Sequence, residues 1–150
     1  MTNTKSYKNG LIEGVVFCFY KDKKVLLEDR GKGFNVETFF TNGTIENKDK
    51  QNNSDYITNA LYREVSEEFS DNIDILEKTF LGELIVPEIN VLFYVFIITK
   101  WEGDFPDVIH ESGEPDSKIS FFTIDEARAL FKYDSAHKIL DRVIQFTKNE

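Results

Sequence analysis

The stretch ALYREVSEEFS, residues 60–70, places three glutamates and one arginine close together. On a helix, Glu64 lies three residues from Glu67 and four from Glu68, so the three carboxylates project onto one patch. Arg63 can pair with Glu67, four residues later, but one arginine cannot neutralise the group. A hard divalent cation such as Mg²⁺ would remove the repulsion, because carboxylates, water and phosphate oxygens are its ligands. The spacing is also typical of a solvated helix face in an acidic protein, so it leaves both interpretations open.

The helix that carries these carboxylates is predicted over Ser54–Phe69. Asn53 or Ser54 can cap its N-terminus, and Asp55 suits the positive end of the helix dipole. An apolar residue recurs every fourth position and predicts a stripe that faces the core, with the glutamates facing outward. The stripe consists of Ile57, Leu61, Val65 and Phe69.

Composition limits the class of protein. The chain has 150 residues, 41% of them hydrophobic, which fits one compact domain over residues 1–150. The net charge of −9 argues against a long nucleic-acid partner, because a phosphate backbone would be repelled. We see neither a secretory signal nor an apolar stretch of the roughly 18 residues that a membrane span needs. The lone Cys18 lies in an apolar run and predicts a buried structural thiol. We therefore expect a soluble, cytoplasmic protein without a membrane partner.

Runs of apolar and alternating residues around the helix predict a mixed β-sheet. We expect a hairpin over Leu11–Glu28, a short strand over Phe34–Phe40, and a central strand over Val91–Thr99 that is buried on both faces. Two further helices are expected over Asp125–Phe131 and Ser135–Thr147. The last helix would turn four apolar side chains inward: Ile139, Leu140, Val143 and Phe146. This order predicts an α/β fold in which a sheet is sandwiched by helices.

The residues REVSEE resemble the core of the Nudix box, G-x5-E-x7-R-E-U-x-E-E-x-G-U, where U is a bulky aliphatic residue. Upstream, NGTIE (residues 42–46) resembles the family's Gly-Gly-x-x-Glu segment, with Gly43 at the first glycine of the box and Asp55 at its first glutamate. The resemblance extends over most of the chain, from about Leu11 to Leu130, and implies a Nudix-type α/β/α sandwich. Five of the most informative box positions are filled by Arg63, Glu64, Val65, Glu67 and Glu68.

The sequence departs from the box in three places. Gly43 and Arg63 lie 20 residues apart where the box has 14, so six extra residues fall in the polar segment Thr41–Asp55. We predict that this segment is a long exposed loop. Asn42 replaces the first glycine of the pair, and Ser70 replaces the glycine that closes the helix. The spacing within the helix itself is unaltered.

The resemblance implies a hydrolase that cleaves a diphosphate linkage in a nucleoside diphosphate derivative or a nucleoside triphosphate, with Mg²⁺ or Mn²⁺ as cofactor. By the same resemblance, Glu67 and Glu68 are the principal metal ligands, and Glu64 is a metal ligand or the base that activates water. Arg63 would orient Glu64 by bidentate pairing. The backbone carbonyl of Gly43 is a further candidate metal contact.

Additional candidates lie outside the helix. Glu46 ends the NGTIE segment and is a candidate for substrate contact. Arg30 and Lys32 are candidates for steadying the phosphates, although ordinary surface charge explains them equally well. A glutamate outside the box completes the site in many family members, and the segment HESGEPD offers Glu111 and Glu114 without distinguishing between them.

Histidines and aromatic residues are weaker candidates. His137 lies in a predicted helix beside apolar residues and is expected to be structural, whereas His110 lies close to acidic candidates and could take a minor catalytic or binding role. Trp101, Tyr94 and Phe39 can stack on a nucleobase, but packing in the core is the commoner role of such residues.

Two alternatives to an enzyme remain open. A nucleotide-binding or sensor domain with the Nudix fold and little or no catalysis is favoured by Asn42, Ser70 and the six extra residues, and is opposed by the intact REVSEE. An acidic protein-interaction domain would use the glutamates only as solvated surface. The expected partner of the favoured enzyme is a small nucleotide, and the sequence leaves open whether the chain forms a homodimer.

Overall fold

The computed structural model describes residues 4–29, 37–51, 55–109 and 116–148. Within these ranges the chain forms three α-helices and two short 3-10 helices: α1 (Tyr56–Glu68), α2 (Ile124–Leu130), α3 (Asp134–Thr147), η1 (Asn47–Lys50) and η2 (Pro87–Ile89). The strands are β1 (Tyr7–Lys8), β2 (Leu11–Lys21), β3 (Lys24–Asp29), β4 (Thr38–Phe40), β5 (Asn42–Thr44), β6 (Asp74–Val86), β7 (Val91–Glu102), β8 (Val108–Ile109) and β9 (Ser117–Thr123). None of the three α-helices in this part of the chain combines the length and apolar composition that crossing a membrane requires.

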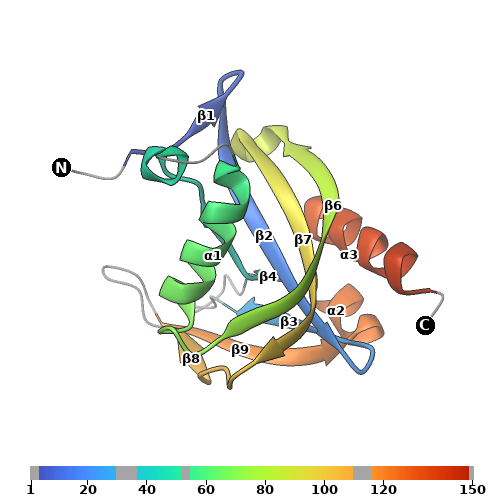
Figure 1. Ribbon diagram of the computed structural model, residues 1–150. Coiled ribbons are helices and arrows are strands. Elements are labelled where there is room, and N and C mark those ends of the chain that lie inside the picture. The colour runs from blue at the N-terminus through green and yellow to red at the C-terminus, as the bar shows by residue number, and fades with distance from the viewer. Residues whose placement is uncertain (1–3, 30–36, 52–54, 110–115, 149–150) are drawn as a thin grey trace.

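The strands form a mixed sheet in the order β6-β7-β2-β3-β9-β8 (Figure 1). The central strands β2 and β7 run parallel, whereas β2 and β3 form the predicted antiparallel hairpin, with Tyr20 opposite Val25. The short strand β5 pairs with β2 and places Gly43 opposite Val15. The sheet therefore holds the glycine segment beside the most deeply buried strand of the fold.

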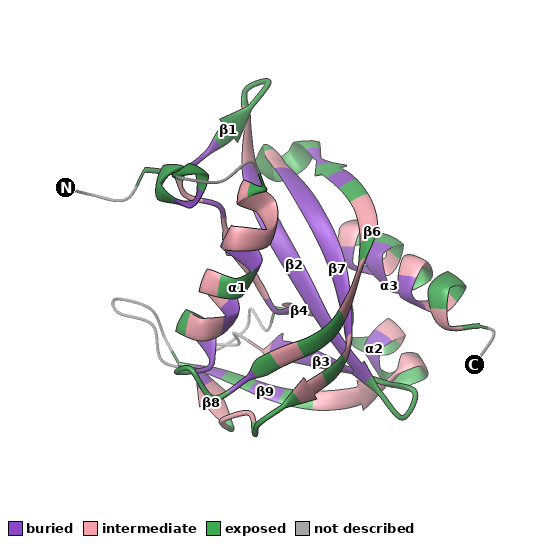
Figure 2. Cartoon of the chain, viewed as in Figure 1, coloured by how far each residue is buried: buried purple, intermediate pink, exposed green. Residues whose placement is uncertain are grey.

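Helices cover both faces of this sheet (Figure 1). Successive side chains of a strand point to opposite sides, and those of β2 are apolar on both sides, so each face needs a helix to bury it. Val15 and Phe17 pack with α1 on one face, and Val16 and Cys18 pack with α2 and α3 on the other. Figure 2 shows that burial is concentrated in β2 and β7. The predicted α/β sandwich, its central strand and the buried thiol of Cys18 are confirmed.

The two C-terminal helices lie within one residue of their predicted bounds. One side chain of α3 was placed wrongly by the sequence pattern, since Phe146 is 45% exposed. Phe146 lies in the last turn of α3, and this end of the helix points away from the sheet (Figure 1). The remaining three predicted inner residues are buried: Ile139, Leu140 and Val143.

The prediction of a long exposed loop over Thr41–Asp55 is wrong. Thr41, Ile45 and Asp49 are buried, because β5 joins the sheet and η1 folds back on α1. Thr41 Oγ1 donates a hydrogen bond of 2.7 Å to the carbonyl oxygen of Phe17. Polar residues are tolerated here since backbone and side-chain hydrogen bonds satisfy them.

Candidate active site

The helix α1 positions the central carboxylates. It begins at Tyr56 rather than at Ser54, and the side chain of Asp55 caps it by accepting a hydrogen bond of 3.1 Å from the backbone N–H of Thr58. Asn53 and Ser54, the expected caps, lie outside the described residues. The predicted apolar stripe is confirmed, since Leu61, Val65 and Phe69 are buried and Ile57 is half-buried against the same cluster.

Arg63 makes its bidentate ion pair with Asp49, a buried residue of η1. Its Nε lies 2.7 Å from Oδ1 and its Nη2 lies 2.9 Å from Oδ2. The structure corrects two expectations. The bidentate partner of Arg63 is Asp49 and not Glu64. Asp55 caps the helix and is not the first acidic residue of the box. Asp49 lies six residues after Gly43, which is the G-x5-E spacing of the box with aspartate in place of glutamate. The six extra residues therefore fall between Asp49 and Arg63.

The same guanidinium draws three further carboxylates together. Nη1 of Arg63 lies 3.0–3.2 Å from carboxylate oxygens of Glu67, Glu64 and Glu46. Lys48 adds a second cation, with its Nζ 3.3 Å from Glu46. The predicted pairing of Arg63 with Glu67 is confirmed. Because four carboxylates share two cationic side chains, the cluster keeps an excess of negative charge that favours a cation.

Glu64 is packed against Gly43. A Cβ atom added to Gly43 would lie 2.1 Å from Cδ of Glu64, so the carboxylate occupies the space that any other side chain at position 43 would need. Burial raises the pKa of Glu64 to about 7; the charge of Arg63 opposes this rise and the charge of Glu67 adds to it. A carboxyl with such a pKa can accept or release a proton near neutral pH, which a general base requires.

Glu67 and Glu68 differ in their surroundings. The side chain of Glu67 is 54% exposed, whereas Glu68 is only 8% exposed. The three glutamates therefore do not form the uniformly outward patch that the helical spacing predicted. Glu67 and Glu68 line a cavity of about 370 Å³ where the end of α1 meets the segment before β8. Asp107 lines it too and was missed, because nothing in the sequence links it to α1.

The oxygen ligands around α1 suit a hard divalent cation in their chemistry. In the described ranges, however, no three acidic, histidine or cysteine side chains converge as a metal-binding group. Glu64 and Glu67 instead both point at Arg63. The side chain of Glu67 is 54% exposed, so a change of its rotamer is enough to free its carboxylate from Arg63.

A buried carboxylate fixes both ends of the segment that contains the six extra residues. Glu13 of β2 accepts hydrogen bonds of 2.5 Å from Ser6 Oγ and from Tyr56 Oη, and a third from Tyr94 Oη. Nζ of Lys50 lies 3.9 Å from Glu13 and 4.9 Å from the ring centre of Tyr56. Lys50 ends η1 and Tyr56 begins α1, so the fixed termini keep the insertion from displacing Arg63. Sequence reasoning missed Glu13, which looks like one polar residue in an apolar strand.

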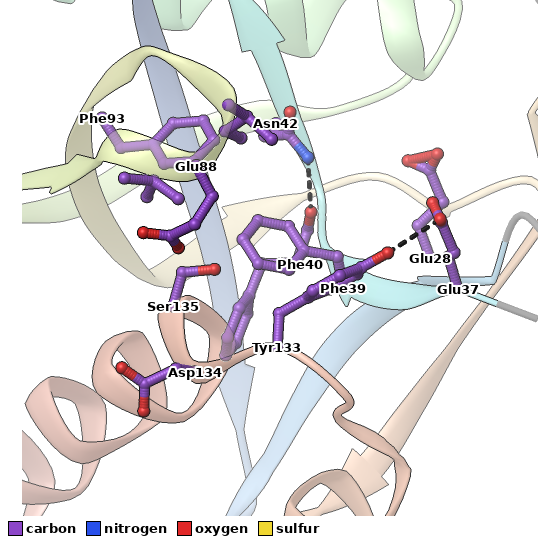
Figure 3. A pocket seen from close by; sticks show the side chains of 12 residues that line it. Glu28, Glu37, Phe39, Phe40, Asn42, Glu88, Phe93, Tyr133, Asp134 and Ser135 are labelled. Atoms are coloured by element: carbon purple, nitrogen blue, oxygen red, sulfur yellow. Dashed lines mark hydrogen bonds between the residues drawn. The ribbon is translucent and has the colours of Figure 1, made fainter.

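A larger cavity, of about 510 Å³, opens on the α3 side of the sheet (Figure 3). Asn42 lines it, and its amide donates a hydrogen bond of 2.9 Å to the carbonyl oxygen of Phe40. Its neighbour Gly43 faces Glu64, because consecutive residues of β5 point to opposite sides. The backbone of Asn42 is extended, so this position does not require the glycine of the family pattern. Four aromatic rings and four carboxylates also line the cavity: Phe39, Phe40, Phe93, Tyr133, Glu28, Glu37, Glu88 and Asp134.

The three aromatic candidates for base stacking lie in different parts of the structure. Phe39 lines the cavity. Tyr94 is buried and donates a hydrogen bond to Glu13, and Trp101 stacks on Phe121 with a ring-centre distance of 6.0 Å. His137 has a structural contact as expected, since its Nε2 lies 3.2 Å from the carbonyl oxygen of Phe131. Five other candidates lie outside the described residues: Arg30, Lys32, His110, Glu111 and Glu114.

Comparison with known proteins identifies the fold. No protein-family model and no curated protein sequence matches the chain. Among solved structures, an ADP compounds hydrolase superposes with a TM-score of 0.66 at 17% identity, covering 91% of this chain and 73% of that one. A MutT Nudix hydrolase from Burkholderia pseudomallei has a TM-score of 0.66 at 15% identity, covering 87% of this chain and 96% of that one. The chain has the Nudix fold. A MutT protein from Bacillus halodurans extends this Nudix likeness, with a TM-score of 0.65 at 19% identity over 88% of this chain and 81% of that one.

Proposed function

We propose that this protein hydrolyses a diphosphate linkage in a nucleoside diphosphate derivative or a nucleoside triphosphate. The observation that carries the proposal is the placement of Asn42 and Gly43, adjacent residues that face the 510 Å³ cavity and Glu64 respectively. Among the described strands β5 pairs only with β2, so a nucleotide that runs round the other edge of β5 would place its base in the cavity and its diphosphate beside α1. The Nudix hydrolases that share this fold support the same reaction class.

Mg²⁺ or Mn²⁺ is the cofactor that fits these residues. Glu67 and Glu68 would hold it, together with the backbone carbonyl of Gly43, and Glu64 would be either a further ligand or the base that activates water. The bound cation would neutralise the charge that develops on the non-bridging phosphate oxygens. The carboxylates around Arg63 outnumber the positive charges, so binding of a cation would reduce the repulsion among them.

Residues of the chain would handle the proton. Where Glu64 is not a ligand of the cation, it would accept a proton from the attacking water. The water oxygen forms a bond to one phosphorus as the bridging bond to that phosphorus breaks, and the second phosphate group leaves with the bridging oxygen. Arg63, fixed by Asp49, holds one oxygen of Glu64 at 3.1 Å and keeps the carboxylate in place.

The remaining candidates would complete the substrate contacts. We propose Glu46 as a neighbour of the bound diphosphate, acting through its ion pairs with Arg63 and Lys48. Arg30 and Lys32 stay candidates for the phosphates. One of Glu111 and Glu114 stays a candidate for completing the metal site.

A substrate panel tests the proposal. The protein is incubated with nucleoside triphosphates, dinucleoside polyphosphates and nucleotide sugars, with Mg²⁺ or with EDTA, and release of phosphate, pyrophosphate or nucleoside monophosphate is measured. We expect turnover of at least one of these classes in Mg²⁺ and none in EDTA. Nucleotide binding without turnover of any class would refute the proposed catalysis and favour a nucleotide-binding domain.

A further inference from the structure

We propose that the 510 Å³ cavity selects nucleobases that carry an exocyclic amino group, and that Glu28 determines this selection. The inference rests on the proposed function, because it concerns the part of the substrate that enters the cavity beside Asn42. It goes further by naming the chemical property that distinguishes good substrates from poor ones.

The cavity has the size and the apolar walls that a base needs. Its volume of about 510 Å³ lies within the usual range of small-molecule pockets. Phe39 and Phe93 stand side by side in its wall, with ring centres 6.0 Å apart and planes inclined by 34° (Figure 3). Aromatic rings stack on any base, so these walls provide affinity without choosing among bases.

The charged residues of the lining would distinguish one base from another. Four of the described lining residues are acidic and none is a lysine or arginine. An ionised carboxylate only accepts hydrogen bonds, so it favours amino and ring N–H groups and repels carbonyl oxygens at the same position. The same negative charge repels phosphate groups. The lining therefore also sets the orientation of the substrate, with its base in the cavity and its phosphates at α1.

Three of the four carboxylates are poorly placed to discriminate. Glu37 is exposed, and it accepts a hydrogen bond of 2.8 Å from Tyr133 Oη, as Figure 3 shows. Asp134 is exposed and pairs with Lys138, whose Nζ lies 3.0 Å from its carboxylate. Glu88 lies on η2 and is exposed to water. Because water competes for exposed carboxylates, contacts with Glu37, Asp134 and Glu88 would distinguish bases weakly.

Glu28 is different because it is only 3% exposed while lining the cavity. Its position in β3, between Phe39 of β4 and Ile119 of β9, holds the side chain on regular sheet backbone. A carboxylate can accept several hydrogen bonds, so a base can add a donor to the contacts that Glu28 already makes. Where water is excluded, a base that presents a carbonyl oxygen instead of an amino group meets full repulsion.

Matched pairs of nucleotides test the inference. GTP and ITP differ only by the exocyclic amino group, and CTP and UTP differ by an amino group in place of a carbonyl. We expect the wild-type protein to prefer GTP to ITP, and CTP to UTP, by about tenfold in kcat/KM. Glu28→Gln should bring both ratios close to one. Glu102→Gln, at an exposed position at the end of β7, should leave them unchanged.

A binding measurement separates failure of this inference from failure of the proposed function. Dissociation constants of GMP and IMP are measured by calorimetry, with and without Glu28→Gln. Tighter binding of GMP that Glu28→Gln abolishes would support the inference even if no nucleotide were hydrolysed. Equal kcat/KM for GTP and ITP in a protein with Mg²⁺-dependent turnover would overturn the inference and leave the proposed function standing. Ratios unaffected by Glu28→Gln would overturn the role of Glu28.

Discussion

Arg63 and Asp49 are joined by two parallel hydrogen bonds of 2.7 and 2.9 Å, although the long segment that includes the six extra residues separates them in the chain. The pair ties α1 to η1 and holds the guanidinium against Glu64 and Glu67. A bidentate arginine–carboxylate pair fixes geometry as well as charge. The insertion therefore leaves the arrangement of the candidate active site intact.

Replacing Asp49 should weaken both the fold and the proposed catalysis. In Asp49→Asn the guanidinium of Arg63 loses its charged bidentate partner, and we expect the free energy of unfolding to fall by about 2 kcal/mol. We expect kcat to fall about tenfold, because Arg63 then holds Glu64 less firmly. Urea denaturation and steady-state kinetics measure the two effects, with the exposed Asp104→Asn as control. Wild-type stability in Asp49→Asn would contradict the structural role.

The stabilising effect of Asp49 should depend on pH. Burial alone would raise the pKa of Asp49, but hydrogen bonds from Arg63 and from the backbone N–H of Glu46, together with nearby positive charge, outweigh it and lower the pKa. A carboxyl with a lowered pKa stabilises the folded state above its unfolded value of about 3.9, and loses this effect as the pH falls below that value. The difference in unfolding free energy between the wild type and Asp49→Asn should shrink between pH 5 and pH 3. A difference that stays constant over this range would contradict the ion pair.

Gly43→Ala should impair catalysis more than folding. The added Cβ would overlap the carboxylate of Glu64, with a separation of 2.1 Å from Cδ. The clash is with the end of a flexible side chain, so the protein can fold by moving Glu64 away from its place. We expect a melting temperature within a few degrees of the wild type and a loss of kcat of more than about tenfold. Thr44→Ala, in the same strand, is the control, and full activity of Gly43→Ala would show that the position of Glu64 is unimportant.

Glu13→Gln tests the anchoring of the inserted segment. Glu13 is fully buried and accepts hydrogen bonds from Ser6, Tyr56 and Tyr94. The amide of glutamine offers one acceptor oxygen instead of two, so the three hydroxyl donors can no longer all be satisfied. We expect the free energy of unfolding to fall by about 2 kcal/mol. The exposed Glu102→Gln should change it by less than about 0.5 kcal/mol, and equal stability of both variants would contradict the anchor.

Ser70→Gly should stabilise the protein. Ser70 follows α1 in a left-handed conformation with φ of 54°, which costs an L-residue about 1 kcal/mol and costs glycine little. The serine therefore adopts a conformation that glycine would adopt at lower cost. We expect a higher unfolding midpoint by up to about 1 kcal/mol, partly offset by the greater freedom of glycine in the unfolded chain. Ser120→Gly, in the strand β9, should instead destabilise.

The sequence predicted the features that depend on periodic patterns. The helix around Arg63 and the buried strand over Val91–Thr99 follow from apolar spacing, which reports directly which side faces the core. The pairing of Arg63 with Asp49 was missed because a count back from Arg63 leads to Asp55, whereas a count forward from Gly43 leads to Asp49, and only the position of the insertion decides between the two. The role of Asp49 became clear only from the distances.

The segment around β5 was predicted wrongly for a different reason. Its pairing with β2 uses backbone hydrogen bonds, which do not depend on side-chain type, so a polar sequence such as Asn42-Gly43-Thr44 can form a strand. Ile45 was its one visible apolar residue, and its complete burial shows how a single anchor can hold a polar segment to the core. The cavity beside Asn42 draws residues from five separate parts of the chain, an arrangement that no local pattern predicts.

The most direct test of the central claim is the initial rate of Mg²⁺-dependent hydrolysis of the best substrate by the wild type and by Glu68→Gln. Glu68 is buried at the end of α1, and its replacement by glutamine keeps its size while removing the charge that would bind the cation. We predict a loss of rate of about 100-fold or more with an unchanged circular dichroism spectrum, and no loss in Glu102→Gln. Hydrolysis by Glu68→Gln at the wild-type rate would contradict the assignment of the chemistry to α1.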